Sequence, residues 1–286
     1  MAILTIAWLT IREAARRRLF LALLVLTAVS VALTGWGFSQ VAQYTPPVAS
    51  AADATAKEIL YSQLLVLVTF MFSFVLALSA AFISAPMVAA DLESGVALAM
   101  LARPMRRSSY LLGRWLGVLV LIAVYAVASG AVELAVVRLT TGFLPPHPTE
   151  AVLFLVGEAA VLLTLGAALA TRLSAITAGI IALILFGLAW IGGIVGGIGA
   201  AIDDQTVIQA GQISRYLLPT DGLWRGTVFQ LEPLSLLLGG LGGGPVARAY
   251  PFYEPAPPPE TYVWWCVGWV VVVLALGLWS FHRREI

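Results

Sequence analysis

The amino-acid sequence predicts an all-α membrane protein with six transmembrane helices in a single domain, residues 1–286. Three observations predict it: the composition, the number of long apolar runs, and the placement of the arginines. Of 286 residues, 60% are hydrophobic and 11% are charged, and the mean hydropathy is +0.96. A soluble domain carries roughly 25% charged residues. The surface of this chain therefore has too few charges to face water and must mostly face lipid.

Six apolar runs are long enough to cross a bilayer, which takes about 20 predominantly apolar residues in a helix. The runs cover about 19–38, 60–83, 110–134, 151–171, 174–200 and 262–281. The fourth and fifth come from one apolar stretch that we divide at the turn 171–174, where Arg172 lies. The first run also resembles the apolar core of a cleavable signal peptide. The apolar residues 3–11 that precede its arginines disfavour that alternative.

The basic residues indicate which side each end of the chain occupies, because cytoplasmic loops are enriched in Lys and Arg. With the N-terminus inside, the inner segments hold eleven of the 16 basic residues. We therefore expect a multi-pass protein of the plasma or inner membrane with both termini in the cytoplasm. The inner basic residues are Arg12, Arg16, Arg17, Arg18, Arg103, Arg106, Arg107, Arg114, Arg172, Arg283 and Arg284.

Two further segments are expected to lie at the membrane surfaces. Residues 1–18 have apolar side chains at positions 4, 7, 8 and 11, which is helical spacing, and include Trp8. They predict an interfacial helix, although a cytoplasmic extension of the first span fits as well. The outer segment 202–261 is about sixty residues long. We expect short helices within it, and whether they enter the bilayer stays open.

The inner segment 90–109 carries the most specific pattern. Its apolar stretch 96–101 predicts a short amphipathic helix at the inner surface, and Pro104 ends that helix because the residue before a proline disfavours the α conformation. Arg103, Arg106 and Arg107 would then face the cytoplasm and the lipid headgroups.

This segment resembles the first cytoplasmic loop of the type-2 permease family of ATP-binding-cassette transporters. That family shows a Glu-x-Gly-Thr-Leu run, a Leu-Leu pair, a Pro, an Arg three residues later, and a Gly-Lys pair that enters the next span. The chain departs from this pattern with Val96 for Thr and Arg114 for Lys. The positions that match this loop motif are Glu93, Gly95, Leu101, Pro104, Arg107, Gly113 and Arg114.

Two other runs, 10–13 and 218–221, resemble the branch of the family that contains the permease of the nitrous-oxide-reductase maturation transporter.

The resemblance implies that residues 90–109 form a coupling helix, which docks into a separate nucleotide-binding ATPase subunit. It also implies a second permease copy, identical or different, with the dimer seam on the second and fifth spans. For Glu93 and Arg107, both residue type and spacing match, whereas orientation alone explains Arg16, Arg17, Arg18, Arg283 and Arg284. The residues expected to couple to the ATPase are Glu93, Gly95, Leu101, Pro104, Arg106 and Arg107.

Polar residues within the spans are the other candidates for function, because charges are expensive there and usually face the bundle interior. Glu158 lies inside the fourth span, and Glu133 and Arg138 lie near the outer end of the third. Three interpretations of Glu158 stay open: an ion pair with Arg138, a place on the substrate path, or a solvated outer vestibule. Small residues of the fifth span permit close helix packing, within the subunit or across a dimer. These are Gly192, Gly193, Gly196 and Gly197.

The sequence excludes several classes of function. It contains no phosphate-binding loop, and its single lysine, Lys57, lies on the outer side. His147 and His282 lie on opposite sides of the membrane, so no catalytic triad or metal site is predicted. We expect no nucleic-acid binding and no cofactor bound by this chain, with ATP and magnesium held by the partner subunit.

Three functions remain. The first is a permease subunit of an ATP-driven exporter, surrounded by membrane lipid and driven by the ATPase. The second is a mechanical transducer that passes ATP-driven motion to an extracytoplasmic partner through residues 202–261. The third is a carrier or channel that does not depend on ATP. Association with an ATPase separates the third from the others, and transport into vesicles separates the first from the second.

Overall fold

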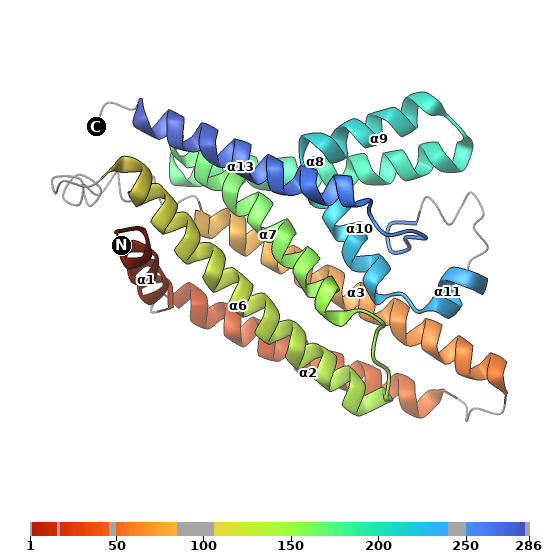
Figure 1. The fold of residues 1–286 in the computed structure, drawn as a ribbon. Helices are drawn as coiled ribbons and strands as arrows, with labels where there is room; N and C mark the ends of the chain where they lie inside the picture. Colours follow the sequence, from red (N-terminus) through yellow and green to blue (C-terminus); the bar gives the residue numbers. More distant parts are fainter. Residues whose placement is uncertain (1, 16–17, 46–49, 85–105, 240–249, 284–286) are drawn as a thin grey trace.

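The computed structural model describes residues 2–15, 18–45, 50–84, 106–239 and 250–283, and within these ranges the chain is helical and contains no strand (Figure 1). The helices pack as one elongated bundle, with both chain ends at the same end of it. They are α1 (Ala2–Ala15), α2 (Arg18–Tyr44), α3 (Ala51–Ser84), α6 (Arg107–Thr141), α7 (Pro148–Ala170), α8 (Ala175–Ile202), α9 (Gln205–Leu217), α10 (Thr220–Leu231), α11 (Leu234–Gly239) and α13 (Glu260–His282).

Six of the described helices are long and apolar enough to cross a membrane, which confirms the predicted fold class. They are α2 from Leu23 onward, α3, α6, α7, α8 and α13. The predicted coupling segment falls mostly on residues 85–105, outside the described residues.

Several helices are longer than the apolar runs that predicted them. Helix α3 begins at Ala51, nine residues before the expected start at 60. Ser50 and Asp53 form a capping box there, in which each side chain accepts a hydrogen bond from the other's backbone N–H. Helix α6 continues to Thr141 and ends at Gly142, whose φ of 76° suits glycine. Hydropathy detects only the lipid-facing part of a helix, so polar continuations of this kind are missed.

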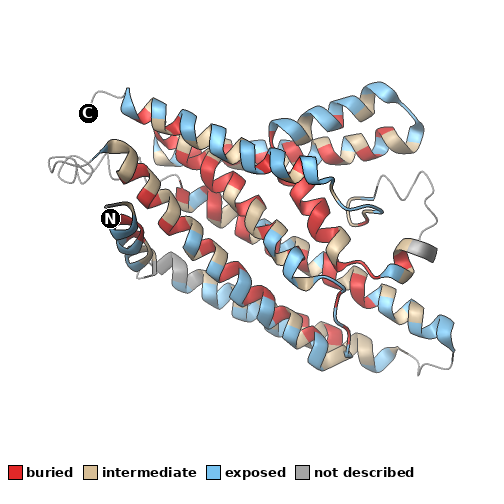
Figure 2. Cartoon of the chain, viewed as in Figure 1, coloured by how far each residue is buried: buried red, intermediate tan, exposed pale blue. Residues whose placement is uncertain are grey.

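Helix α7 lies at the centre of the bundle, where it contacts α3, α6, α8, α10 and α13. Leu162 and Leu163 are fully buried in it. Helix α2 lies at the periphery against α6, and most of its described surface is exposed or half-buried (Figure 2). The apolar faces of α2 that remain uncovered are those expected to meet lipid.

Helices α8 and α9 form a tight antiparallel hairpin. Asp203 turns the chain with a φ of 57°, and Asp204 caps α9 by accepting the backbone N–H groups of Thr206 and Val207. Gly196 and Gly211 face each other across the hairpin: a Cβ added to Gly211 would lie 2.4 Å from the Cα of Gly196. Such close approach requires glycine on both helices.

Helix α10 is buried along nearly its whole length, although it lies in the segment predicted to be an outer loop (Figure 2). It packs against α7, α8 and α3. Gly226 faces the ring of Phe154 on α7, and Thr227 donates a hydrogen bond to the carbonyl oxygen of Ala151. The expected short helices are present as α9, α10 and α11, and α10 forms part of the core.

Candidate functional site

The end of the bundle that holds both termini also holds the beginning of α6 and the end of α13 (Figure 1). Of the predicted coupling residues, Arg106 and Arg107 are described, and Glu93, Gly95, Leu101 and Pro104 lie outside the described residues. Arg106 is exposed at the N-cap of α6. Arg107 donates a hydrogen bond to the carbonyl oxygen of His282 at 3.4 Å. The described end of the predicted coupling segment therefore contacts the end of α13.

Helix α1 packs closely on the first part of α6. A Cβ on Gly113 would lie 2.7 Å from the Cβ of Ile6, and one on Gly117 would lie 2.6 Å from the carbonyl oxygen of Ala7. Arg114, between these glycines, forms an ion pair with Glu13 at 2.6 Å. Sequence reasoning placed Gly113 and Arg114 in the loop motif, whereas the structure shows that they also hold α1 against α6.

The opposite face of α1 is apolar and uncovered. Leu4 and Trp8 are 68% and 65% exposed. Of the predicted apolar positions, Ala7 is buried in the α1–α6 contact while Leu4 and Trp8 are directed away from the protein. An exposed Trp and Leu beside an arginine-rich segment is the arrangement that interfacial helices present to lipid.

The inner turn between α7 and α8 is also fastened to α13. Arg172 donates to the hydroxyl of Ser280 through Nε at 2.9 Å and to the Ser280 carbonyl oxygen at 3.3 Å. The hydroxyls of Thr171 and Ser280 lie 2.9 Å apart. Together with the stacked rings of Tyr110 and Phe281, these contacts link the start of α6 with the ends of α7 and α13.

Glu158 is 3% exposed and accepts a hydrogen bond from the hydroxyl of Ser73 at 2.7 Å. Of the three interpretations of Glu158, the ion pair with Arg138 is not formed in the described residues, where Arg138 is exposed near the end of α6. No basic side chain among the described residues forms an ion pair with Glu158. The carboxylate is therefore held by a neutral hydroxyl between α3 and α7.

Glu133 is in a similar position on α6. It is 5% exposed, accepts a hydrogen bond from the Ser30 hydroxyl at 3.2 Å, and is also hydrogen-bonded by Thr34. Both donors belong to α2. Within the described part of the chain, Glu133 likewise forms no ion pair. Two carboxylates thus lie inside the bundle with hydroxyl partners alone.

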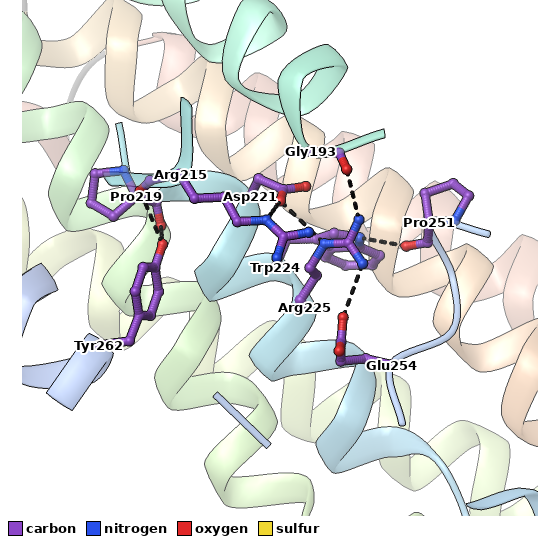
Figure 3. A network of polar contacts seen from close by, with 9 residues as sticks. All are labelled: Gly193, Arg215, Pro219, Asp221, Trp224, Arg225, Pro251, Glu254 and Tyr262. Atoms are coloured by element: carbon purple, nitrogen blue, oxygen red, sulfur yellow. Dashed lines mark hydrogen bonds and ion pairs between the residues drawn. The ribbon is translucent and has the colours of Figure 1, made fainter. Parts of the chain in front are cut away.

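A second group of charges joins α8, α9, α10 and the segment before α13, and we call it the outer network (Figure 3). Asp221 accepts from Nε of Arg215 at 2.8 Å and from Nε of Arg225 at 3.1 Å. Arg225 also donates to Glu254 at 2.9 Å and to the carbonyl oxygen of Gly193 at 3.1 Å. The two arginines and two carboxylates balance in charge.

Neighbouring charges set the protonation of Arg225, and burial sets that of Glu232. Burial alone would lower the pKa of Arg225, but Asp221 and Glu254 raise it above its ordinary value. Nearby Glu232 is 1% exposed, and burial raises its pKa to about 8. Glu232 accepts hydrogen bonds from the Glu254 backbone N–H and the Gln63 amide. It is therefore mostly protonated near neutral pH, while Arg225 stays charged.

The small residues of α8 are used within the subunit. Gly193 leaves space for the Asp221 carboxylate, Gly192 for Ser214, and Gly196 for Gly211. Gly197 is buried on the same helix. These contacts account for the close packing without a second copy, so the small residues need not mark a dimer seam.

The sequence identified Glu133 and Glu158 as polar residues of the spans, but it did not predict the residues that contact them. Ser73 and Ser30 looked like ordinary hydroxyls of apolar helices, which carry no signal of the acid they meet. Arg225 and Glu254 are separated by a Gly-rich stretch, so nothing in the sequence indicated their pairing. The one available signal was the cluster Asp221 to Arg225, spaced by four residues on a helix.

The fold and these sites define a polytopic helical membrane protein with a structured outer segment and no catalytic group identified in its described part. The family described as ABC-2 family transporter protein matches residues 4–286. The chain belongs to that family. Comparison with curated proteins found no match. The family match does not separate branches, so the narrower resemblance to the nitrous-oxide-reductase maturation permease stays a prediction.

Proposed function

We propose that the chain is the permease subunit of an ATP-driven exporter, in which a separate nucleotide-binding subunit hydrolyses ATP and this chain provides the path across the membrane. The observation that carries the proposal is the family match over residues 4–286, together with six apolar helices. The ATPase subunit is the partner that this family implies. A second permease copy would complete the transporter.

The contacts at the inner end of the bundle support a coupling role for residues 90–109. Arg107 lies at the start of α6 and reaches the end of α13, and the turn at Arg172 also contacts α13. A force applied at residues 90–109 would therefore reach α6 directly. Through the contacts with α13, it would also reach the end of α7. Glu93, Gly95, Leu101, Pro104 and Arg106 remain part of the proposed contact with the ATPase by their match to the family motif.

The test co-expresses the chain with its ATPase subunit and compares two charge reversals, Glu93→Lys and Arg107→Glu. Each should lower the stimulated ATPase rate and the amount of ATPase that co-purifies, while membrane insertion is unchanged. The reversal Lys57→Glu, at the opposite end of α3, is the control and should leave both quantities unchanged. Normal coupling in both reversals would remove these residues from the mechanism.

A mechanical transducer is the second candidate, and the exposed apolar side chains of α9 favour it. Ile213 and Leu217 are 60% and 71% exposed on the outer hairpin. They offer a surface for an extracytoplasmic partner, fixed to the bundle by the outer network. ATP-driven uptake into inside-out vesicles would support the exporter. Stimulated ATPase without movement of any substrate, and with an outer partner bound, would support the transducer.

A further inference from the structure

An open groove lies between α2 and α3, on the side of the bundle away from α10. Its volume is about 470 Å³, within the range of pockets that hold small organic molecules. The groove exists because α2 packs against α6 and leaves its other side apart from α3. Leu33, Leu67 and Met71 line its mouth and are exposed. The walls are apolar, so an occupant must itself be largely apolar.

The floor of the groove is aromatic and polar. Phe72 and Tyr125 lie there with their ring centroids 6.0 Å apart, and the Tyr125 hydroxyl is hydrogen-bonded to Thr27. Ser30 and Thr34 also line the groove, and both are hydrogen-bonded to the Glu133 carboxyl group, which does not itself line the groove. A carboxylate behind two hydroxyls, beside two aromatic rings, is an environment that attracts positive charge.

No described basic side chain forms an ion pair with Glu133, so its deprotonated form would gain a charge partner only from a bound cation. In a low-dielectric interior, electrostatic attraction is much stronger than in water. A cation seated in the groove against Phe72 and Tyr125 would be attracted by the two rings and, across the Ser30 and Thr34 hydroxyls, by the carboxylate. An anion would be repelled by the same groups.

We propose that the groove between α2 and α3 binds lipophilic organic cations, with Glu133, reached through Ser30 and Thr34, as the charge partner and with Phe72 and Tyr125 as the aromatic floor. The inference goes beyond the proposed function and does not depend on it, because binding to this groove requires neither ATP nor the ATPase subunit.

The experiment uses the full chain in nanodiscs of zwitterionic lipid and measures equilibrium binding of tetraphenylphosphonium, with binding to empty nanodiscs subtracted. Tetraphenylborate, an anion of the same shape, is measured in parallel. The wild-type chain should bind the cation saturably and the anion no more than empty discs do. Glu133→Gln, which keeps the shape of the side chain, should weaken cation binding about tenfold or more.

A glycine pair gives a matched steric test. Nothing lies within 4 Å of a Cβ added to Gly37, which lines the groove, so the leucine of Gly37→Leu begins in open space and should occupy part of the groove. Gly187 on α8 has the same free space and does not line the groove. Gly37→Leu should abolish cation binding, and Gly187→Leu should leave it unchanged.

Saturable binding of tetraphenylborate as tight as that of the cation would show a purely apolar, lipid-filled groove and would overturn the proposal. Unchanged cation affinity in both Glu133→Gln and Gly37→Leu would do the same. The comparison of cation with anion uses only the wild-type chain, so it holds even if Glu133→Gln does not fold. Loss of ATPase coupling in the Arg107 variant leaves this binding unaffected, which separates the two proposals.

Discussion

The outer network and the two carboxylates inside the bundle bury charge in opposite ways. In the outer network, Asp221 is shared by Arg215 and Arg225, and Arg225 also contacts Glu254. Glu133 and Glu158 have only hydroxyl partners. Removing one member of a balanced pair leaves an uncompensated buried charge, whereas neutralising a carboxylate that has no cation removes such a charge. A single substitution in the first arrangement should therefore cost more stability than one in the second.

The largest effect is expected for Asp221→Asn. The substitution preserves shape but leaves Arg215 and Arg225 without their shared acid, and breaking a buried pair costs about 3–5 kcal/mol. Thermal unfolding of the purified chain in detergent measures it. Asp203→Asn is the control, because Asp203 is exposed and asparagine tolerates its positive φ. An unfolding temperature equal to wild type for Asp221→Asn would show that the outer network contributes nothing to stability.

A smaller loss is expected for Gly211→Ala. The new methyl group would meet the backbone of Gly196 rather than a movable side chain, so α8 and α9 must separate. Overpacking of this kind costs about 1–3 kcal/mol. Gly187→Ala, which adds its methyl group to open space, should instead raise stability by about 0.5–1 kcal/mol. The two alanine substitutions should thus shift the unfolding temperature in opposite directions, and equal shifts would contradict the close packing of the hairpin.

The pH dependence of stability should reveal Glu232, the one acid of the outer segment that burial keeps protonated. Its pKa in the fold is about 8, above the ordinary value of 4.5. Between these values the folded chain holds a proton that the unfolded chain has released. The stability from Glu232 is thus complete below pH 4.5 and decreases as the pH rises to about 8. Glu232→Gln should flatten the unfolding temperature between pH 5 and 8, relative to wild type, and parallel curves would contradict the prediction.

The smallest effect on stability is expected for Glu158→Gln. The amide oxygen can still accept the hydrogen bond from Ser73, and a neutral amide of the same shape has no charge to desolvate, so the unfolding temperature should stay the same or rise. If Glu158 lies on the substrate path, ATP-driven transport should fall in the same variant. A destabilisation as large as that of Asp221→Asn would erase the distinction between the two regions.

Sequence reasoning succeeded where a residue's role depends on its own segment. Apolar length predicted the six spans, and the rarity of acids in lipid marked Glu158 as a buried group. It failed where the role depends on a distant partner. Arg225 contacts Glu254, which is 29 residues further along the chain. Helix α10 is buried, although its sequence contains Asp221 and Arg225. In the sequence, a segment that contains Asp and Arg resembles a solvated loop, because their pairing in the fold cannot be seen there.

The unbroken length of α6 has a mechanical consequence. Its 35 residues contain no proline and form one helix from Arg107 to Thr141, about 52 Å long at 1.5 Å per residue. A helix without proline can curve gently but resists a sharp kink, so it transmits movement along its length. With α1 braced against its inner third, any rotation imposed at Arg107 displaces Glu133 near the other end. Glu133 and the contacts of Arg107 with α13 are thereby joined by a single helix.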